Sequence, residues 1–286
     1  MFRFKQFFIL SSILFHFNCS FFKKNKINIY SNSLSGKVIY FSKLEEGYKR
    51  SNSFNKSWSK LYSKRFKPYH RFKNRKYRIA GYYNQLDESY IVIEDEKGRK
   101  FKKKIESVID SLISLPSYIF FEERKNEAEK LIGETIWLND TKDKKHFYTF
   151  SNYNFKRFET VRVLKIIDFQ NSNNDYPLWL KIQSNTGENG FVRFNGKEGK
   201  TGFKDHYYIS NPLPKEWGKS LIKKIVAGEL ELGMTKKQVR VTVGNPEKIN
   251  ITSSRHGISE QWIYKNHNGE NIFYQFEYET LTYISK

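Results

Sequence analysis

A pair of helix signals near the carboxyl terminus constrains this chain more than any other feature of its sequence. Thr235 is followed three residues later by Gln238, which predicts a capping box at the start of a helix. Met234 and Val239 occupy the two positions of a hydrophobic staple around that cap. The sequence therefore predicts a helix that begins at a defined residue and packs one apolar side against a core.

The segments around this helix predict a small mixed domain. Gly244 and Pro246 are residues that end a helix. A preceding helix, capped by Ser220 and ending near Gly228, has its apolar residues on one face. Three strand-like segments follow, and Asn268-Gly269 is a hairpin turn between the last two: 248–252, 260–265 and 271–278, the last continuing through 281–284. We expect an α/β sandwich of two layers over 218–286.

This carboxyl-terminal segment resembles the BamE/SmpA/OmlA family of outer-membrane lipoproteins. The resemblance implies two helices on a three-stranded antiparallel sheet, and a role in the assembly of outer-membrane proteins. In that family the domain is nearly the whole protein, whereas here it covers about a quarter of the chain. The residues that carry the resemblance have a structural role: Gly233, Met234, Thr235, Gln238, Val239, Gly244, Pro246, Trp262 and Tyr264.

The middle of the chain alternates between apolar and polar residues and is predicted to be mostly strands. We expect a β-meander with helices over 77–130 and a small barrel-like β domain over 131–210. The helices are expected at 105–115 and at 120–131, where the second contains a run of good helix formers. The segment 177–196 reads as a hairpin with its turn at 186–190. This hairpin resembles the closing strands of bacterial Src homology 3 domains, which bind peptides or proteins. Trp179 and Phe191 are either core residues of the barrel or ligand-facing aromatics.

The amino terminus predicts an export signal. Arg3 and Lys5 precede an apolar run over residues 7–17, which is too short to cross a bilayer as a helix. The single cysteine of the chain, Cys19, ends this run and resembles the lipidated cysteine of bacterial lipoproteins. His16 and Asn18 depart from the usual residues before that cysteine, and the alternatives are an uncleaved signal anchor and a cytosolic protein. We expect a lipoprotein on the periplasmic face of the outer membrane.

A basic, aromatic-rich segment follows over 20–76. Residues 1–104 hold 25 Lys and Arg but only 7 Asp and Glu, although the whole chain carries a net charge of +21. The spacing of Phe54, Trp58, Tyr62 and Phe66 predicts one face of a helix. The segment is a solvated tether, a strip that lies on anionic lipid, lipopolysaccharide or wall polymer, or a site for single-stranded nucleic acid. The candidate contacts with an anionic surface are Lys56, Lys60, Lys64, Arg65, Arg71 and Arg75.

No enzyme motif is present in the sequence. It contains no phosphate-binding glycine loop, no zinc-protease helix motif and no nucleophile elbow. The six histidines have no metal-ligand spacing, so we expect neither cofactor nor metal. We expect a non-enzymatic envelope lipoprotein that acts as a binding or scaffold module in outer-membrane assembly or cell-wall association, with envelope proteins as partners. A nucleic-acid-binding protein and an auxiliary wall-active enzyme are the alternatives, and an exported protein rarely meets nucleic acid.

Overall fold

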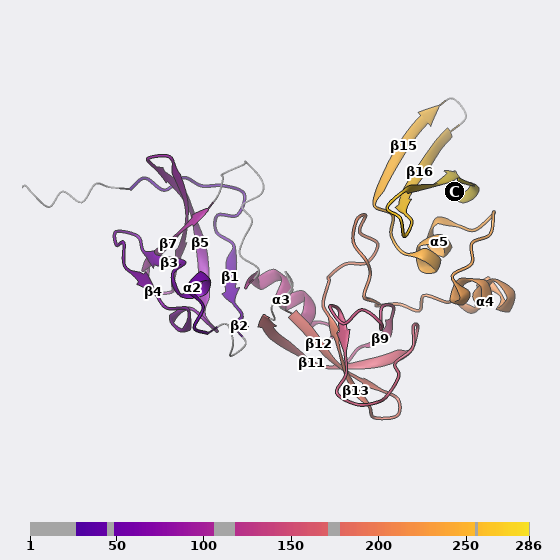
Figure 1. Cartoon of the computed structure of the whole chain (residues 1–286), viewed down its shortest axis with the longest axis horizontal. Helices are drawn as coiled ribbons and strands as arrows, with labels where there is room; N and C mark the ends of the chain where they lie inside the picture. The colour runs from indigo at the N-terminus through magenta and orange to yellow at the C-terminus, as the bar shows by residue number, and fades with distance from the viewer. Residues whose placement is uncertain (1–26, 45–48, 106–117, 171–177, 255–256, 286) are drawn as a thin grey trace, which may run out of the picture. The chain divides into compact units, whose positions relative to one another are not determined.

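The computed structural model of the chain describes residues 27–44, 49–105, 118–170, 178–254 and 257–285 (Figure 1). The protein is a mixed α and β structure made mostly of strands. It divides into two compact units. Unit 1 comprises residues 1–37, 55–68 and 77–114, and unit 2 comprises residues 38–54, 69–76 and 115–286. The predicted signal peptide with Cys19 and most of the helix expected over 105–115 lie outside the described residues.

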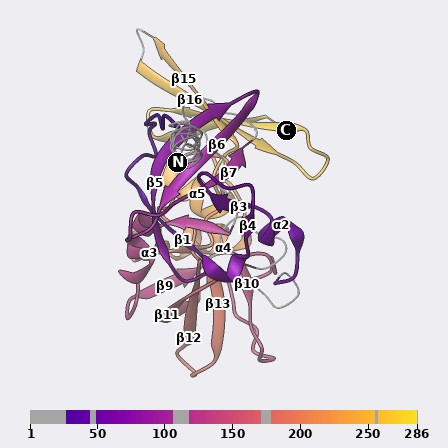
Figure 2. The ribbon, with the colours of Figure 1, turned by 90° about the vertical axis from the view of Figure 1, so that its left-hand side faces the viewer.

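Unit 1 is built on an antiparallel sheet. Within it, β5, β6 and β7 run side by side as the predicted meander (Figures 1 and 2). Alternate residues of these strands, such as Ile79, Ile93 and Phe101, are buried and form one face of the sheet. The sheet order is β4-β3-β7-β6-β5, with bounds β3 Trp58–Lys60, β4 Phe66–Lys67, β5 Lys76–Gln85, β6 Glu88–Glu94 and β7 Lys100–Ile105.

The prediction of a helix over 54–66 from the spacing of its aromatic residues is wrong. A single turn, α2 (Asn52–Asn55), is followed by strands β3 and β4. Trp58 is 1% exposed, whereas Tyr62 is 54% and Phe66 is 48% exposed, so these three side chains do not share a face. Aromatic residues favour strands as well as amphipathic helices, and pairing of β3 with β7 decides between the two.

The expectation of a solvated tether over 20–76 is also wrong for the residues that the structure describes. Tyr30 exchanges two backbone hydrogen bonds with Tyr82, of 2.7 and 2.9 Å, inside unit 1. In unit 2, Tyr69 and Phe72 are buried, and both rings pack on Phe41. The aromatic residues that made this segment look like an interfacial strip therefore serve largely as core residues.

The first part of unit 2 combines short strands with one helix. Strand β1 pairs antiparallel with β8, and the helix predicted over 120–131 is confirmed as α3. The Tyr69 hydroxyl donates a 2.5 Å hydrogen bond to the Ser42 carbonyl oxygen, and burial raises the pKa of that hydroxyl. The bounds are β1 Val38–Phe41, β2 Lys43–Leu44, η2 Tyr69–Arg71, β8 Ile119–Phe121 and α3 Glu122–Glu129.

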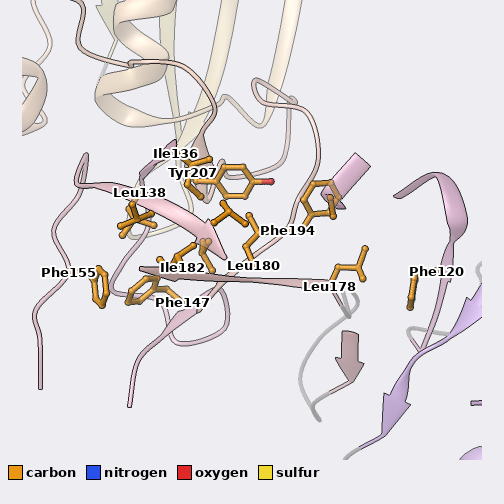
Figure 3. Close-up of a cluster of buried hydrophobic side chains, with 14 residues drawn as sticks. Phe120, Ile136, Leu138, Phe147, Phe155, Leu178, Leu180, Ile182, Phe194 and Tyr207 are labelled. Atoms are coloured by element: carbon orange, nitrogen blue, oxygen red, sulfur yellow. The ribbon is translucent and has the colours of Figure 1, made fainter. Parts of the chain in front are cut away.

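A curled sheet contributes most of a 14-residue buried core of unit 2 (Figure 3). The predicted hairpin over 177–196 is confirmed: β12 and β13 pair antiparallel, and Gly187 lies in the turn with φ 89°. Leu180, Ile182 and Val192 project from this hairpin into the core and are fully buried. The order is β10-β13-β12-β11-β9-β14, with bounds β9 Thr135–Leu138, β10 Phe147–Tyr148, β11 Thr160–Gln170, β12 Leu178–Ser184, β13 Asn189–Arg193 and β14 Tyr207–Tyr208.

The last segment contains two helices and a four-stranded antiparallel sheet. The capping box of α5 is confirmed: Thr235 Oγ1 accepts from the Gln238 amide at 3.3 Å, and Gln238 Oε1 accepts from the Thr235 amide at 2.7 Å. The helices and the sheet share one core that includes Ile225, Val239 and Trp262. The bounds are η3 Lys215–Trp217, α4 Lys219–Ala227, α5 Lys236–Val243, β15 Lys248–Ser254, β16 Gly257–Lys265, β17 Asn271–Glu277 and β18 Thr280–Ser285.

Two expectations for this segment are corrected. The sheet has four strands rather than three, because Tyr278 adopts φ 56° in a tight turn and β18 folds back on β17. An aromatic residue rarely takes this conformation, so the turn leaves no signal in the sequence. The first helix begins at Lys219 and is capped by Gly218 rather than by Ser220, because the preceding 3-10 turn ends at that glycine.

Candidate anion-binding groove

The six basic residues predicted to contact an anionic surface are all exposed, but they fall into two groups. Lys56, Lys60, Lys64 and Arg65 belong to unit 1, on and beside strands β3 and β4. The other two, Arg71 and Arg75, belong to unit 2. Of the first group, Lys56 and Lys64 line a groove of unit 1, whereas Lys60 and Arg65 are not among its lining residues.

A groove on unit 1 gathers lysines from distant parts of the sequence. It has a volume of about 460 Å³ and is lined by five lysines and one glutamate. Lys56 and Lys64 come from the predicted basic segment, and the other three come from β7. We call this the lysine groove; its lining is Lys56, Ser57, Ser59, Ser63, Lys64, Phe66, Glu88, Tyr90, Lys102, Lys103 and Lys104.

Strand register explains how β7 contributes to the lysine groove. Ser59 of β3 lies opposite Lys102, and Tyr90 of β6 lies opposite Lys104. Since alternate residues of a strand point to opposite faces, Lys102 and Lys104 share one face. Phe101 between them is buried on the other face. Lys102 and Lys104 thus supply charge from one face of β7, while Phe101 is buried on the other face, which also carries Lys103.

One lysine of the groove is neutralised by a carboxylate. Lys104 Nζ lies 2.7 Å from Glu88 Oε1, and the Tyr90 hydroxyl donates a hydrogen bond to the same carboxylate. These contacts hold the pKa of Glu88 below its ordinary value, and the hydrogen bond from Lys104 is the largest cause. The only carboxylate that lines the groove is therefore already paired.

The remaining charge of the groove is positive. Lys102 Nζ lies 5.0 Å from the centre of the Tyr90 ring, and burial followed by repulsion from Lys64 lowers the pKa of Lys102. Within the described part of the chain, neither Lys56 nor Lys64 forms an ion pair with a carboxylate. A site with clustered, partly desolvated cations attracts an anion that can contact several of them at once.

The prediction that Trp179 and Phe191 face a ligand is wrong. Trp179 has no exposed surface, and the guanidinium carbon of Arg193 lies 4.3 Å from the centre of its ring. Phe191 is 9% exposed and stacks on Tyr148 with ring centres 4.7 Å apart. Both rings are core residues of the curled sheet, which is the alternative that the sequence left open.

The motif residues near the carboxyl terminus have structural positions. Met234, Val239 and Trp262 are at most 2% exposed in one core. The Tyr264 hydroxyl donates to the Gly244 carbonyl oxygen at 2.9 Å, which ties the end of α5 to the sheet. The left-handed helical conformation expected of Gly244 is wrong: this residue has φ 93° and ψ −170°, an extended conformation with positive φ that glycine tolerates. Gly233 has φ 93°, and Pro246 is buried after the helix.

No local pattern marks Lys102, Lys103 and Lys104 as binding residues. Alternation along the chain indicates only that a strand of the meander ends in this lysine run. The register that places Ser59 opposite Lys102 joins residues more than 40 positions apart, and local patterns do not report such pairing.

Two further properties hold for the part of the chain that the structure describes. No group of three or more His, Cys, Asp or Glu side chains is placed to hold a metal ion. Among the same residues, no helix is both long enough and apolar enough to span a membrane.

Comparison of the chain with protein-family models, with curated proteins and with solved structures finds no match. The case for a function therefore comes from the residues of this chain and their arrangement.

Proposed function

We propose that this protein is a lipoprotein of the outer membrane, anchored through Cys19 on the periplasmic face, whose unit 1 binds the phosphate groups of anionic membrane lipids. The lysine groove is the observation that carries this proposal. The protein acts by binding and not as an enzyme. Its unit 2 serves as a scaffold that presents folded modules to envelope proteins.

Charge and aromatic content favour a lipid surface as the ligand. A lysine close to an anionic leaflet contributes about 1 kcal/mol, so the contributions of several lysines on one face add up to a strong attraction to the surface. Phe66 lines the lysine groove and is 48% exposed, and aromatic side chains are favoured at the headgroup level of a bilayer. With the acyl chains already providing attachment, the groove would set the orientation of unit 1 on the membrane.

We further propose a specific fold for each of two segments of unit 2. For residues 131–210, the curled sheet with the β12–β13 hairpin supports a Src homology 3-like barrel. For residues 218–286, the capping box and the core shared by α4, α5 and the sheet support a BamE-like sandwich, with the fourth strand as a departure. Either module offers surfaces for protein binding rather than a catalytic site.

The anchor predicts a specific covalent change. We expect the protein extracted from the membrane fraction of its host to have the mass of residues 19–286 plus acyl chains. The Cys19→Ser variant has no thiol for the lipid, so we expect it to lack this mass. Intact-protein mass spectrometry of both forms measures the difference. A full-length, unmodified mass in the soluble fraction would show that the chain is not a lipoprotein.

The lysine groove predicts a loss of lipid binding when its charge is removed. We expect Lys64→Gln with Lys102→Gln to weaken binding to vesicles of phosphatidylglycerol and phosphatidylcholine roughly 30-fold, since each lysine contributes about 1 kcal/mol. Co-sedimentation at low salt measures this. Binding should fall as the salt concentration rises, because salt screens exposed charges.

A matched control separates the groove from the overall charge. Arg78→Gln with Lys97→Gln removes the same charge from exposed positions of unit 1 outside the groove. We expect this control to change vesicle binding less than threefold. Every variant also carries Cys19→Ser, so no acyl chain holds it on the vesicles, and residues 1–18 contribute equally to each. Equal losses in both double variants, or tighter binding to a single-stranded oligonucleotide than to the vesicles, would contradict the proposed function.

A further inference from the structure

A second pocket lies entirely within unit 2 and differs in character from the lysine groove. It has a volume of about 450 Å³, which is within the range of about 300–1,000 Å³ typical of small-molecule sites. Its walls come from β8, β12 and the segment around residues 194–206. The apolar lining consists of Ile119, Phe120, Phe121, Leu178, Phe194 and Phe203.

Cations border this apolar pocket. Arg124, Lys197 and Lys200 line it, and none of the three forms an ion pair with a carboxylate among the described residues. Lys204 also lines the pocket, but its Nζ lies 2.7 Å from Asp140 Oδ2. Three positive side chains therefore remain for a ligand.

The position of Arg124 is defined by its neighbours. Its guanidinium carbon lies 5.1 Å from the centre of the Phe194 ring. Gly196 has φ 80°, and a Cβ atom at this residue would collide with Arg124 Nη1. The backbone at Gly196 thus leaves room for the guanidinium beside the apolar lining, where a planar donor group can bind a carboxylate or phosphate with two hydrogen bonds.

The pocket lining includes one carboxylate, Asp205, whose hydrogen-bond donors are neutral groups and which the three cations without an ion pair outnumber. Asp205 is buried, and its carboxylate accepts from the Gly199 amide at 3.0 Å and from Asn245 Nδ2 at 3.0 Å. His206 is 4% exposed, stacks on His146 with ring centres 4.0 Å apart, and contacts the Arg193 carbonyl oxygen through Nδ1 at 3.0 Å. The pocket therefore combines an apolar interior with a positively charged border.

We propose that this pocket binds a small anionic amphiphile, with its apolar body against the phenylalanines and its carboxylate or phosphate group against Arg124 and Lys200. Burial of the apolar body supplies binding free energy in proportion to the area removed from water. The charged hydrogen bonds to Arg124 select an anion over a neutral molecule of the same shape. This site is separate from the lysine groove, because its lining belongs to a different unit.

Three small molecules with the same alkyl chain and different head groups test the apolar and the charged contributions to binding separately. We expect isothermal titration of the full chain to show binding of decanoate and of decyl phosphate, and at least tenfold weaker binding of decanol. Decanoate and decyl phosphate distinguish a carboxylate ligand from a phosphate ligand. Absence of binding by both anions, or equal affinity for decanol, would overturn the proposal.

Substitutions of residues that line the pocket connect the binding to it. We expect Arg124→Gln to weaken decanoate binding at least tenfold and to leave decanol unchanged. Phe203 is 55% exposed, so Phe203→Ala should fold normally and weaken both probes to the same extent. The control Lys223→Gln, on the exposed side of α4, should change neither affinity.

The two proposals fail independently of each other. Lys64→Gln with Lys102→Gln should bind decanoate as the unmodified protein does, and Arg124→Gln should bind anionic vesicles normally. If Arg124→Gln keeps full affinity for decanoate, the pocket is not the site of binding and the inference is wrong.

Discussion

Replacement of Trp179 by alanine is expected to lower the free energy of unfolding of unit 2 by about 3–5 kcal/mol, because a buried tryptophan leaves a large cavity. The side chain has no exposed surface. Its ring packs edge-on against Tyr148 at 5.2 Å and lies beneath the Arg193 guanidinium. Loss of the ring would also expose that fully buried cation to a cavity. Urea unfolding followed by circular dichroism measures the change.

Phe150→Ala provides the matched control for Trp179. Phe150 lies in the same aromatic group, with its ring 5.4 Å from Tyr148, but is 86% exposed. We expect this substitution to change the free energy of unfolding by less than about 1 kcal/mol. If Trp179→Ala retained full stability, the ring would not stabilise the core of the curled sheet as its burial indicates.

Acidification is expected to destabilise the protein through His206, by up to about 3 kcal/mol between pH 6.5 and pH 4. Burial, followed by repulsion from His146, lowers the pKa of His206 from 6.5 to about 4. The unfolded chain therefore binds a proton in this interval that the folded protein does not bind. Stability from this residue is fully present above pH 6.5 and is lost progressively as the pH falls to about 4.

The partners of His206 explain why the folded protein keeps it neutral. A proton on His206 would add charge next to His146, whose own pKa is lowered chiefly by burial, and near the buried Arg193. Burial of Asp205 raises the pKa of its carboxyl and acts in the opposite direction at low pH. The test must therefore compare variants, because the change of the wild-type free energy of unfolding with pH contains both effects.

Measurement of the free energy of unfolding at several values between pH 7 and pH 4 tests this prediction. We expect His206→Asn to show a shallower dependence on pH than the wild type, whatever its stability at pH 7. The exposed His267→Asn serves as the control and should keep the wild-type dependence. If the free energy of unfolding depended on pH in the same way for His206→Asn and the wild type, the pKa of His206 would not be lowered in the folded protein.

Many elements of this protein were predictable because their signals are local. The capping box at Thr235 and Gln238 involves residues three positions apart, and its geometry is present as expected. The strands of the meander and the hairpin over 177–196 follow from alternation of side chains and from a glycine in the turn. Helix α3 follows from a run of good helix formers.

The candidate site was predictable only in part. Lys56 and Lys64 belong to a basic run that is visible in the sequence, and the structure places both in the lysine groove. The run also contains Arg71 and Arg75, which fall in the other unit. The aromatic residues between these cations suggested an interfacial helix, yet Trp58 and Tyr69 are buried. A spacing of four residues does not distinguish a helix from short strands when distant segments supply the pairing.

By itself, the sequence determined a mixed chain made mostly of strands, with the caps of α5, the hairpin turns and a surplus of positive charge in its first 104 residues. These features depend on contacts between close neighbours and on composition. Tertiary structure alone decided that β7 lies beside β3, that Trp179 is buried, and that phenylalanines from β8 and from residues 194–206 enclose a pocket bordered by Arg124. These features depend on contacts between residues that are far apart in the sequence. The free energy of such contacts comes from burial and strand pairing, which patterns within a short segment do not reveal.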